Sequence, residues 1–241
     1  MAKPIYKRIL LKLSGEALLG KKEFGIDGDV VKKISKTLKD LSSLNVELSV
    51  VVGGGNILRG SSASKEGLER STADYMGMLG TLINAMAIQD SLDKLGSDAR
   101  VLSAINAPQV AEPYIRRRAV RHLEKGRIVI FAAGTGNPYF STDTAAALRA
   151  LEIEADVMIK ATKVDGVYDC DPHKNKKAKK FEMLCFDDVI KNDIKVMDQT
   201  AFTLCRENNL PVIVLNLFED GTIKKALMGE KVGTIIKNKG E

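Results

Sequence analysis

The chain has 241 residues, 44% hydrophobic and 28% charged, a balance that excludes a disordered chain, a collagen-like repeat and a small disulfide-stapled scaffold. Its formal net charge of +6 favours anionic partners such as nucleic acid, anionic lipid or phosphorylated metabolites. The sequence has three cysteines without a C-x-x-C pair and only two histidines, which predicts a cytoplasmic protein without a zinc site or a disulfide framework. It has no apolar run of about 18 residues and no signal-peptide pattern, so no membrane span is expected.

Short apolar runs alternate with longer segments of helical period. The predicted strands are Arg8–Leu13, Glu47–Val52, Ala99–Ser103, 127–132, 156–160 and Val212–Asn216, with Thr234–Lys237 as a candidate edge strand. Nearly continuous apolar strands between helices predict an open, mostly parallel sheet covered by helices on both faces, in three αβα layers. Ligands bind beyond the carboxyl ends of such strands, so function is expected in the loops that follow them. No linker divides the chain, and one domain over 1–241 is expected.

Two helices are predicted from apolar residues spaced three and four apart. The first has Asp27 or Asp29 as its N-cap and Gly96 ends the second. We expect both apolar stripes to pack into the core, although a methionine stripe can also form a partner surface. The stripes are Val31, Ile34, Leu38 and Leu41 in the first helix, and Met76, Leu79, Ile83 and Met86 in the second.

The loops after the first two strands contain lysine and glycine. Lys12 is followed by Ser14 and Gly15, which suits a phosphate, although a strand lysine that points to water is the alternative. A near-match to the G-x-x-x-x-G-K pattern begins here, but Lys22 replaces the Ser or Thr that holds magnesium, so a P-loop is rejected. The run 53–55 is all glycine, which predicts close backbone approach to a ligand or positive φ, with a plain turn as the alternative.

Two later loops also suit a nucleotide. Ser141, Thr142 and Asp143 stand near the start of a predicted helix, where backbone N–H groups favour an anion, although Asp143 as a simple N-cap is the alternative. The segment 160–172 offers an aromatic ring, carboxylates and backbone groups for a base and a ribose. Within it begins a stretch, 165–180, that is expected to form a loop or a small hairpin.

Together these motifs resemble the bacterial-type uridylate (UMP) kinases of the amino-acid-kinase family over nearly the whole chain. The similar segments are 12–17, 53–60, 74–78, 135–143, 161–172 and 195–198. The stretch 135–143 is the most specific, because relatives with carboxylate or carbamate acceptors are not expected to share it. Two features depart from the pattern: Ser141 stands where many members have Thr, and the run 116–118 of three arginines is unfamiliar.

The resemblance implies an amino-acid-kinase fold and transfer of the ATP γ-phosphoryl group to UMP, which gives UDP and ADP in pyrimidine nucleotide biosynthesis. It implies Mg²⁺ as the metal, a homohexamer and a cytoplasmic location. Many members are activated by GTP and inhibited by UTP. The N-terminal part would serve the acceptor and the phosphates, and the C-terminal part would hold the ATP base and ribose.

The resemblance also implies site residues. The catalytic group is Lys12, Arg59, Asp143 and Asp198. The ATP-binding group is Lys12, Leu13, Ser14, Gly15, Gly55, Arg59, Thr162, Tyr168 and Asp171. The UMP-binding group is Gly54, Asp74, Thr135, Gly136, Asn137, Pro138, Tyr139, Phe140, Ser141 and Thr142. The segment linked to GTP activation is Gly20, Lys21, Lys22, Glu23, Phe24 and Gly25. No side chain is assigned as a direct ligand of the metal.

Two other functions are weighed against this one. A relative with a small acid acceptor, such as an acetylglutamate or carbamate kinase, would share the fold and the ATP site. A nucleic-acid-binding protein is suggested by the basic runs 116–121 and 173–180, but only 5% of residues are aromatic, Trp is absent and no RNP-type or zinc motif occurs. A hydrolase is disfavoured because the sequence has no G-x-S-x-G motif.

Overall fold

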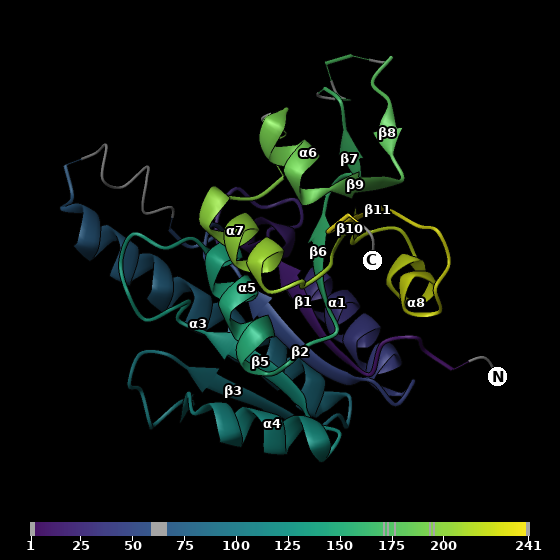
Figure 1. The fold of residues 1–241 in the computed structure, drawn as a ribbon. Helices are drawn as coiled ribbons and strands as arrows, with labels where there is room; N and C mark the ends of the chain where they lie inside the picture. The colour runs from purple at the N-terminus through teal and green to yellow at the C-terminus, as the bar shows by residue number, and fades with distance from the viewer. Residues whose placement is uncertain are drawn as a thin grey trace.

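The computed structural model describes residues 3–58, 67–170, 172, 174–175, 177–192, 194 and 196–239. In this part of the chain, nine strands form one sheet in the order β4-β3-β5-β2-β1-β6-β10-β11-β9 (Figure 1). Its strands are β1 (Arg8–Leu13), β2 (Glu47–Val52), β3 (Ala99–Ser103), β4 (Glu112–Pro113), β5 (Ile128–Ala132), β6 (Val157–Thr162), β9 (Met183–Cys185), β10 (Val212–Asn216) and β11 (Thr234–Lys237). A separate hairpin pairs β7 (Val167–Tyr168) with β8 (Lys180–Phe181).

Helices cover both faces of the sheet. The helices are α1 (Gly28–Ser42), α3 (Arg70–Lys94), α4 (Arg116–Glu124), α5 (Thr142–Glu152), α6 (Phe186–Lys191), α7 (Gln199–Glu207) and α8 (Thr222–Leu227), with a 3₁₀ turn η1 (Gly15–Leu18). Residues of α1, α3 and α8 share one core cluster with the sheet, and residues of α4, α5, α6 and α7 share the other (Figure 1). The predicted αβα layering is therefore confirmed.

Alternate residues of each central strand face the two helical layers, as the pleat requires. In β1, Leu11 and Leu13 pack in the cluster of α1 and α3, whereas Leu10 packs in the cluster of α4 to α7. All three leucines are fully buried, which explains why the strand is an unbroken apolar run. By the same alternation Lys12 belongs to the face that α5 covers.

The predicted strands are confirmed, with two differences at the C-terminal side of the sheet. β6 continues two residues beyond its predicted end, to Thr162. Thr234–Lys237 is not an edge strand, because β9 pairs with its outer side. β11 runs antiparallel to β10, and β9 runs parallel to β11. β9 escaped prediction because three residues are too few to show a period.

The ends of the two predicted helices agree with their sequence signals. Asp27 is the N-cap of α1, and its Oδ1 accepts hydrogen bonds from the backbone N–H groups of Asp29 at 3.0 Å and Val30 at 3.2 Å. Gly96 follows the end of α3 with φ of 75°, the left-handed conformation that glycine adopts without strain. The stop signal is therefore confirmed.

The apolar stripe of α3 was predicted to lie in the core, and that prediction is wrong. Met76, Leu79, Ile83 and Met86 are 39–48% exposed. The opposite side of α3 carries a second apolar set, which includes Ile88 and Leu92 and packs on the sheet. Periodicity shows that a face is apolar but not what covers it, so the sequence could not distinguish the two stripes. The exposed stripe is left as an apolar surface of the isolated chain.

Among the described residues, no helix is both long and apolar enough to cross a bilayer.

Candidate active site

The loops after β1, β2, β5 and β6 emerge at one edge of the sheet, because these strands are neighbours and parallel. Lys12 of β1 lies in register with Val51 of β2 on one side and with Lys160 of β6 on the other. The two lysines therefore extend side by side from the same face of the sheet. Both stand near the carboxyl end of a strand.

A carboxylate from α5 joins these two lysines. Lys12 Nζ lies 2.7 Å from Asp143 Oδ1, and Lys160 Nζ lies 2.6 Å from Asp143 Oδ2. Lys160 Nζ also donates to the backbone oxygen of Val196 at 2.6 Å. The three side chains are only 12–16% exposed. Ser141 is the N-cap of α5, with Oγ accepting from Thr144 N at 3.0 Å, so Asp143 is not a simple cap.

Burial and ion pairing shift the pKa values of this cluster in opposite directions. Burial alone raises the pKa of Asp143, but the nearby charges of Lys12 and Lys160 and their hydrogen bonds outweigh it, and the pKa is lowered. Burial lowers the pKa of Lys160, and Lys12 lowers it further, while Asp143 and Asp198 raise it. The carboxylate thus stays ionised and organises two ammonium groups that would otherwise repel each other.

Asp198 holds α7 and α5 together. It is the N-cap of α7, where its Oδ1 accepts from Ala201 N at 3.0 Å, and the same oxygen accepts from Thr144 Oγ1 at 2.8 Å. Its Oδ2 accepts from Ser141 Oγ. Among the described residues, Asp198 makes no direct contact with Lys12. Asp198 therefore acts on the lysine cluster through the start of α5 and through its charge.

Lys160 was missing from the predicted site. Its proximity to Lys12 depends on the register of two strands that are far apart in the sequence, and register is not visible in a single chain. One signal was available: Lys160 interrupts a buried apolar run near the carboxyl end of its strand, as Lys12 does in the first strand. A charge in a buried parallel strand needs a partner.

The glycine run after β2 brings the loops together. None of residues 53–55 has positive φ, so that part of the expectation is wrong. Instead, a Cβ at Gly54 would lie 2.4 Å from the carbonyl oxygen of Gly77 in α3. A Cβ at Gly53 would lie 2.9 Å from the backbone nitrogen of Gly15. These glycines let the first loop, the second loop and α3 approach each other more closely than any side chain would allow.

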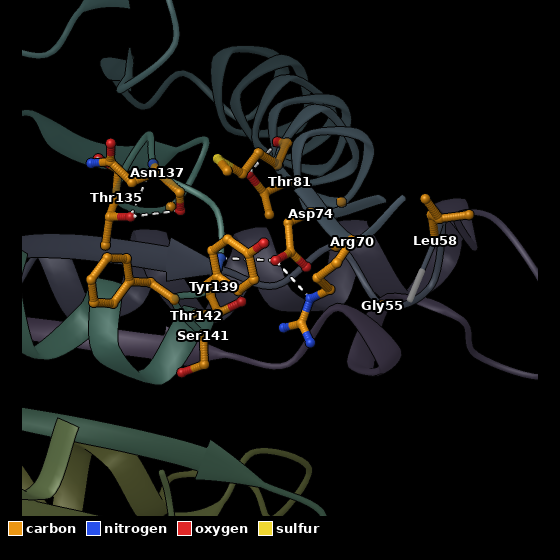
Figure 2. A pocket seen from close by; sticks show the side chains of 15 residues that line it. Gly55, Leu58, Arg70, Asp74, Thr81, Thr135, Asn137, Tyr139, Ser141 and Thr142 are labelled. Carbon is orange, nitrogen blue, oxygen red and sulfur yellow. Dashed lines mark hydrogen bonds and ion pairs between the residues drawn. The ribbon is translucent and has the colours of Figure 1, made fainter. Parts of the chain in front are cut away.

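A first cavity of about 360 Å³ lies between the glycine loop, α3 and the loop after β5, and Figure 2 shows its walls. Its lining residues are Gly54, Gly55, Leu58, Arg70, Asp74, Gly77, Met78, Thr81, Gly134, Thr135, Asn137, Tyr139, Phe140, Ser141 and Thr142. Asp74 Oδ2 accepts from the backbone nitrogen of Tyr139 at 2.8 Å and from Arg70 Nε at 2.8 Å (Figure 2). Eight of the ten predicted UMP-binding residues line this cavity, and Gly136 and Pro138 belong to the same loop.

A second cavity of about 410 Å³ lies beside the hairpin of β7 and β8. Its lining residues are Thr162, Val164, Gly166, Val167, Tyr168, Asp169, Cys170, Pro172, Asn192, Ile194, Val196 and Val214. Tyr168 donates to Asp165 Oδ1 at 2.5 Å, and Lys180 Nζ lies 3.0 Å from Asp165 Oδ2, which ties the hairpin to the loop after β6. Of the two alternatives expected for 165–180, a loop or a small hairpin, the structure has the hairpin.

The lysine cluster adjoins both cavities. Asp143 follows Thr142, which lines the first cavity, and Lys160 bonds Val196, which lines the second. Both volumes fall in the usual range of small-molecule sites, about 300–1,000 Å³. The arrangement can therefore hold two ligands with paired cations between them.

Several predicted residues lie elsewhere. Of the predicted ATP group, Thr162 and Tyr168 line the second cavity, whereas Gly55 lines the first. The side chain of Leu13 is fully buried in the core, so only its backbone is available to a ligand. Arg59 and Asp171 lie outside the described residues.

The segment predicted for GTP activation forms a loop beside the glycine run. Gly20 and Gly25 have positive φ, and Gly25 exchanges two hydrogen bonds of 2.9 Å with Asn56. The side chain of Asn56 in turn pairs with that of Asn84 in α3, through bonds of 2.9 and 2.6 Å. This buried amide pair links the loop to the wall of the first cavity. The rejected P-loop is replaced here by the 3₁₀ turn η1.

A family model described as the amino acid kinase family matches residues 7–216. The chain belongs to the amino acid kinase family. Within it, the structure is similar to a UMP kinase from Bacillus anthracis, with a TM-score of 0.94 and 41% identity over 98% of this chain and 97% of that one.

Two further solved structures resemble this chain. A UMP kinase from Ureaplasma parvum has a TM-score of 0.91 and 37% identity, over 99% of this chain and 100% of that one. A uridylate kinase from Archaeoglobus fulgidus has a TM-score of 0.73 and 29% identity, over 95% of this chain and 99% of that one. The similarity therefore extends over both cavities and the lysine cluster between them.

Proposed function

We propose that this member of the amino acid kinase family is a UMP kinase that transfers the γ-phosphoryl group of MgATP to UMP, giving UDP and ADP in pyrimidine nucleotide biosynthesis. The observation that carries the proposal is the cluster of Lys12, Asp143 and Lys160 between two cavities of nucleotide size. The similarity to UMP kinases at 41% and 37% identity supports the choice of acceptor.

The chemistry of the proposed reaction is mainly a problem of charge. The attacking group is a phosphate oxygen that is already deprotonated at neutral pH, so a strong general base is unnecessary. Catalysis then depends on aligning two anions and on stabilising the charge of the phosphoryl group in transit. Lys12 and Lys160 would supply that stabilisation, and Asp143 would fix their ammonium groups in place. Asp198 would position the start of α5, and Arg59 would fork onto the phosphates.

We assign the acceptor to the first cavity and ATP to the second, within one kinase unit over 1–241. Asp74 would read the ribose or base of UMP, and residues 135–142 would surround the nucleotide. Thr162, Tyr168 and Asp171 would hold the adenosine, and the backbone of 12–15 with Gly55 would meet its phosphates. This division places the N-terminal part on the acceptor side and the C-terminal part on the base and ribose of ATP.

Magnesium fits this site as a partner of the phosphates. Among the described residues, no group of three or more His, Cys, Asp or Glu side chains could hold a metal, and Asp143 and Asp198 are already engaged. Mg²⁺ is commonly bound through substrate phosphates and water with one or two carboxylates. The ATP phosphates would therefore hold the ion, with Asp143 and Asp198 as the nearby carboxylates. When bound, it neutralises phosphate charge.

We further propose activation by GTP through residues 20–25 and inhibition by UTP. The contact of Gly25 with Asn56, and of Asn56 with Asn84, supports the first, because it connects that loop to the first cavity wall. A cytoplasmic location is proposed on the similarity to UMP kinases, together with the cysteine pattern.

Nucleic-acid binding gains no support from the arginine run, since Arg116 pairs with Glu154 and Arg118 lies 3.5 Å from Glu112.

We propose that the protein is a homo-oligomer, in the form of a hexamer. The exposed stripe of α3 supports this, because packing against a second copy of the same helix would remove apolar side chains from water. These are Met76, Leu79, Ile83 and Met86.

Ile83→Glu is expected to disrupt that contact and to lower the molar mass measured by light scattering. Lys32→Glu, an exposed change on α1, is the matched control. An unchanged mass for Ile83→Glu would remove the stripe from the assembly.

A coupled assay of ADP release tests the proposed activity. MgATP is offered with UMP, CMP, dUMP, N-acetylglutamate or carbamate in parallel. Strong turnover with UMP alone is expected, because the first cavity joins a carboxylate at Asp74 to the loop 135–142. Turnover with an acid acceptor would keep the fold and the ATP cavity but reject the nucleotide acceptor. Salt-sensitive binding of RNA or DNA without turnover would instead favour the nucleic-acid alternative.

A further inference from the structure

Arg70 has no role in the predicted site, yet it makes two contacts at the first cavity. Its Nε donates to Asp74 Oδ2 at 2.8 Å, and its guanidinium lies 5.6 Å from the centre of the Tyr139 ring. The backbone nitrogen of Tyr139 donates to the same Asp74 oxygen at 2.8 Å. Figure 2 shows these three lining residues close together, with Arg70 and Asp74 from α3 and Tyr139 from the loop after β5. They form a closed cycle of contacts.

The loop that Arg70 contacts needs external support. Tyr139 has φ of 71°, the left-handed conformation that is unfavourable for a bulky residue, and the residue is 67% exposed. Ala133 also has positive φ, at 60°. Such conformations persist only where surrounding contacts fix them. The contacts from α3 to Tyr139 are the hydrogen bond from its backbone and the cation–π contact with its ring.

The same cycle fixes the carboxylate of Asp74. Arg70 Nε and Tyr139 N both donate to Oδ2. Within the described residues, this leaves Oδ1 as the carboxylate oxygen that can accept a hydrogen bond from the acceptor nucleotide in the cavity. Arg70 is 46% exposed and Asp74 is 14% exposed, so the pair lies at the border between solvent and the cavity.

We infer that Arg70 is a positioning residue that holds the acceptor loop against α3 through Asp74 and Tyr139, and so keeps the acceptor cavity formed before the nucleotide arrives. The inference rests on the proposed function, because it names the residue that prepares the acceptor site. If the loop leaves this position for part of the time, the apparent affinity for the acceptor falls by the same fraction. The transfer step itself, at Lys12 and Asp143, is not affected.

A double-mutant cycle tests this inference against direct binding of the acceptor phosphate by Arg70. Arg70→Gln is expected to raise the KM for UMP about 3- to 10-fold, the size of one exposed ion pair together with one cation–π contact. The kcat should stay within about twofold. Arg70→Lys, which keeps the charge, should give an intermediate KM. With Tyr139→Leu added, the KM of the double variant should be no higher than that of the single variant with the higher KM.

Hydrogen exchange supplies a readout that needs no substrate. Amides of residues 134–141 should exchange faster in Arg70→Gln than in the unmodified protein. Lys94→Gln is the matched control, because it removes another ion pair between residues four apart in α3, to Asp90, far along the helix. That control should leave both the exchange and the KM unchanged.

The outcomes separate the inference from the proposed function. Absence of turnover with any nucleotide would defeat the proposed function, and exchange in 134–141 would then decide the role of Arg70 alone. The inference would be overturned if the effects of Arg70→Gln and Tyr139→Leu on KM multiplied in the double variant. It would also be overturned if Arg70→Gln left hydrogen exchange in 134–141 unchanged. Multiplying effects would indicate that Arg70 binds the acceptor directly.

Discussion

Lys12→Ala is expected to lower kcat about 10²–10³-fold, or about 3–4 kcal/mol, if Lys12 acts like other preorganised donors to a transition state. Its ammonium lies 2.7 Å from Asp143 at the junction of the two cavities, where the charge of the transferring group would develop. The fold should survive, because β1 is paired on both sides, with β2 and with β6. Steady-state kinetics with saturating MgATP and UMP measure the loss.

Lys12→Met provides the volume control for this variant. Methionine keeps most of the buried stem but not the charge, so a charge effect predicts equal losses of kcat in both variants. Thermal unfolding establishes that each variant is folded. A folded Lys12→Ala protein with near-normal turnover would remove Lys12 from the mechanism and leave Lys160 as the cation of the site.

The central sheet could be predicted because a buried parallel strand is apolar on both faces. Arg8–Leu13, Glu47–Val52 and Val212–Asn216 were recovered to the residue for that reason. The short strands β4 and β9 were missed, because their pairing depends on neighbours rather than on their own sequence. The exposed stripe of α3 shows a related limit: its apolar pattern was correct, but the partner that covers such a face is not encoded within the helix.

The site shows the same division between local and nonlocal information. The loop 135–143 was found because its turn residues and its helix start are local features. Lys160 was missed because only the register of β1 and β6 places it beside Lys12. Arg70 was missed because its contact with Tyr139 joins residues that are distant in the chain. The glycine run at 53–55 was visible in the sequence, but the backbone atoms of Gly15 and Gly77 that approach Gly53 and Gly54 come from other elements and could not be predicted.

Asp143→Asn is expected to affect both turnover and stability. The amide cannot balance two ammonium groups that approach the same carboxylate within 2.7 Å and 2.6 Å. Removing one member of a buried ion cluster typically costs about 3–5 kcal/mol, and the slight exposure here places the expected loss near the lower end. The kcat should fall at least as much as in Lys12→Ala, because both lysines lose their orientation. The pKa of Lys160, already lowered by burial, would fall further without Asp143.

The stability difference should depend on pH in a definite direction. Burial raises the pKa of Asp143, but Lys12 and Lys160 outweigh it, so the folded-state pKa lies below the ordinary value. A carboxyl group with a lowered pKa stabilises the fold above its unfolded pKa, and this contribution is lost as the pH falls through the folded value. The gap in unfolding free energy between the unmodified protein and Asp143→Asn should therefore be full at pH 7 and narrow below about pH 4, the ordinary range of Asp.

Glu47→Gln is the matched control for this experiment. Glu47 pairs with Arg8 at 2.5 Å, both side chains are 13% exposed, and the pair joins β1 to β2 at the opposite end of the strands from Lys12. It should cost stability without lowering kcat. Urea unfolding from pH 3 to pH 8 and steady-state kinetics at pH 7 measure both quantities. If Asp143→Asn lost only stability, as Glu47→Gln should, Asp143 would be a structural partner of the lysines and not part of phosphoryl transfer.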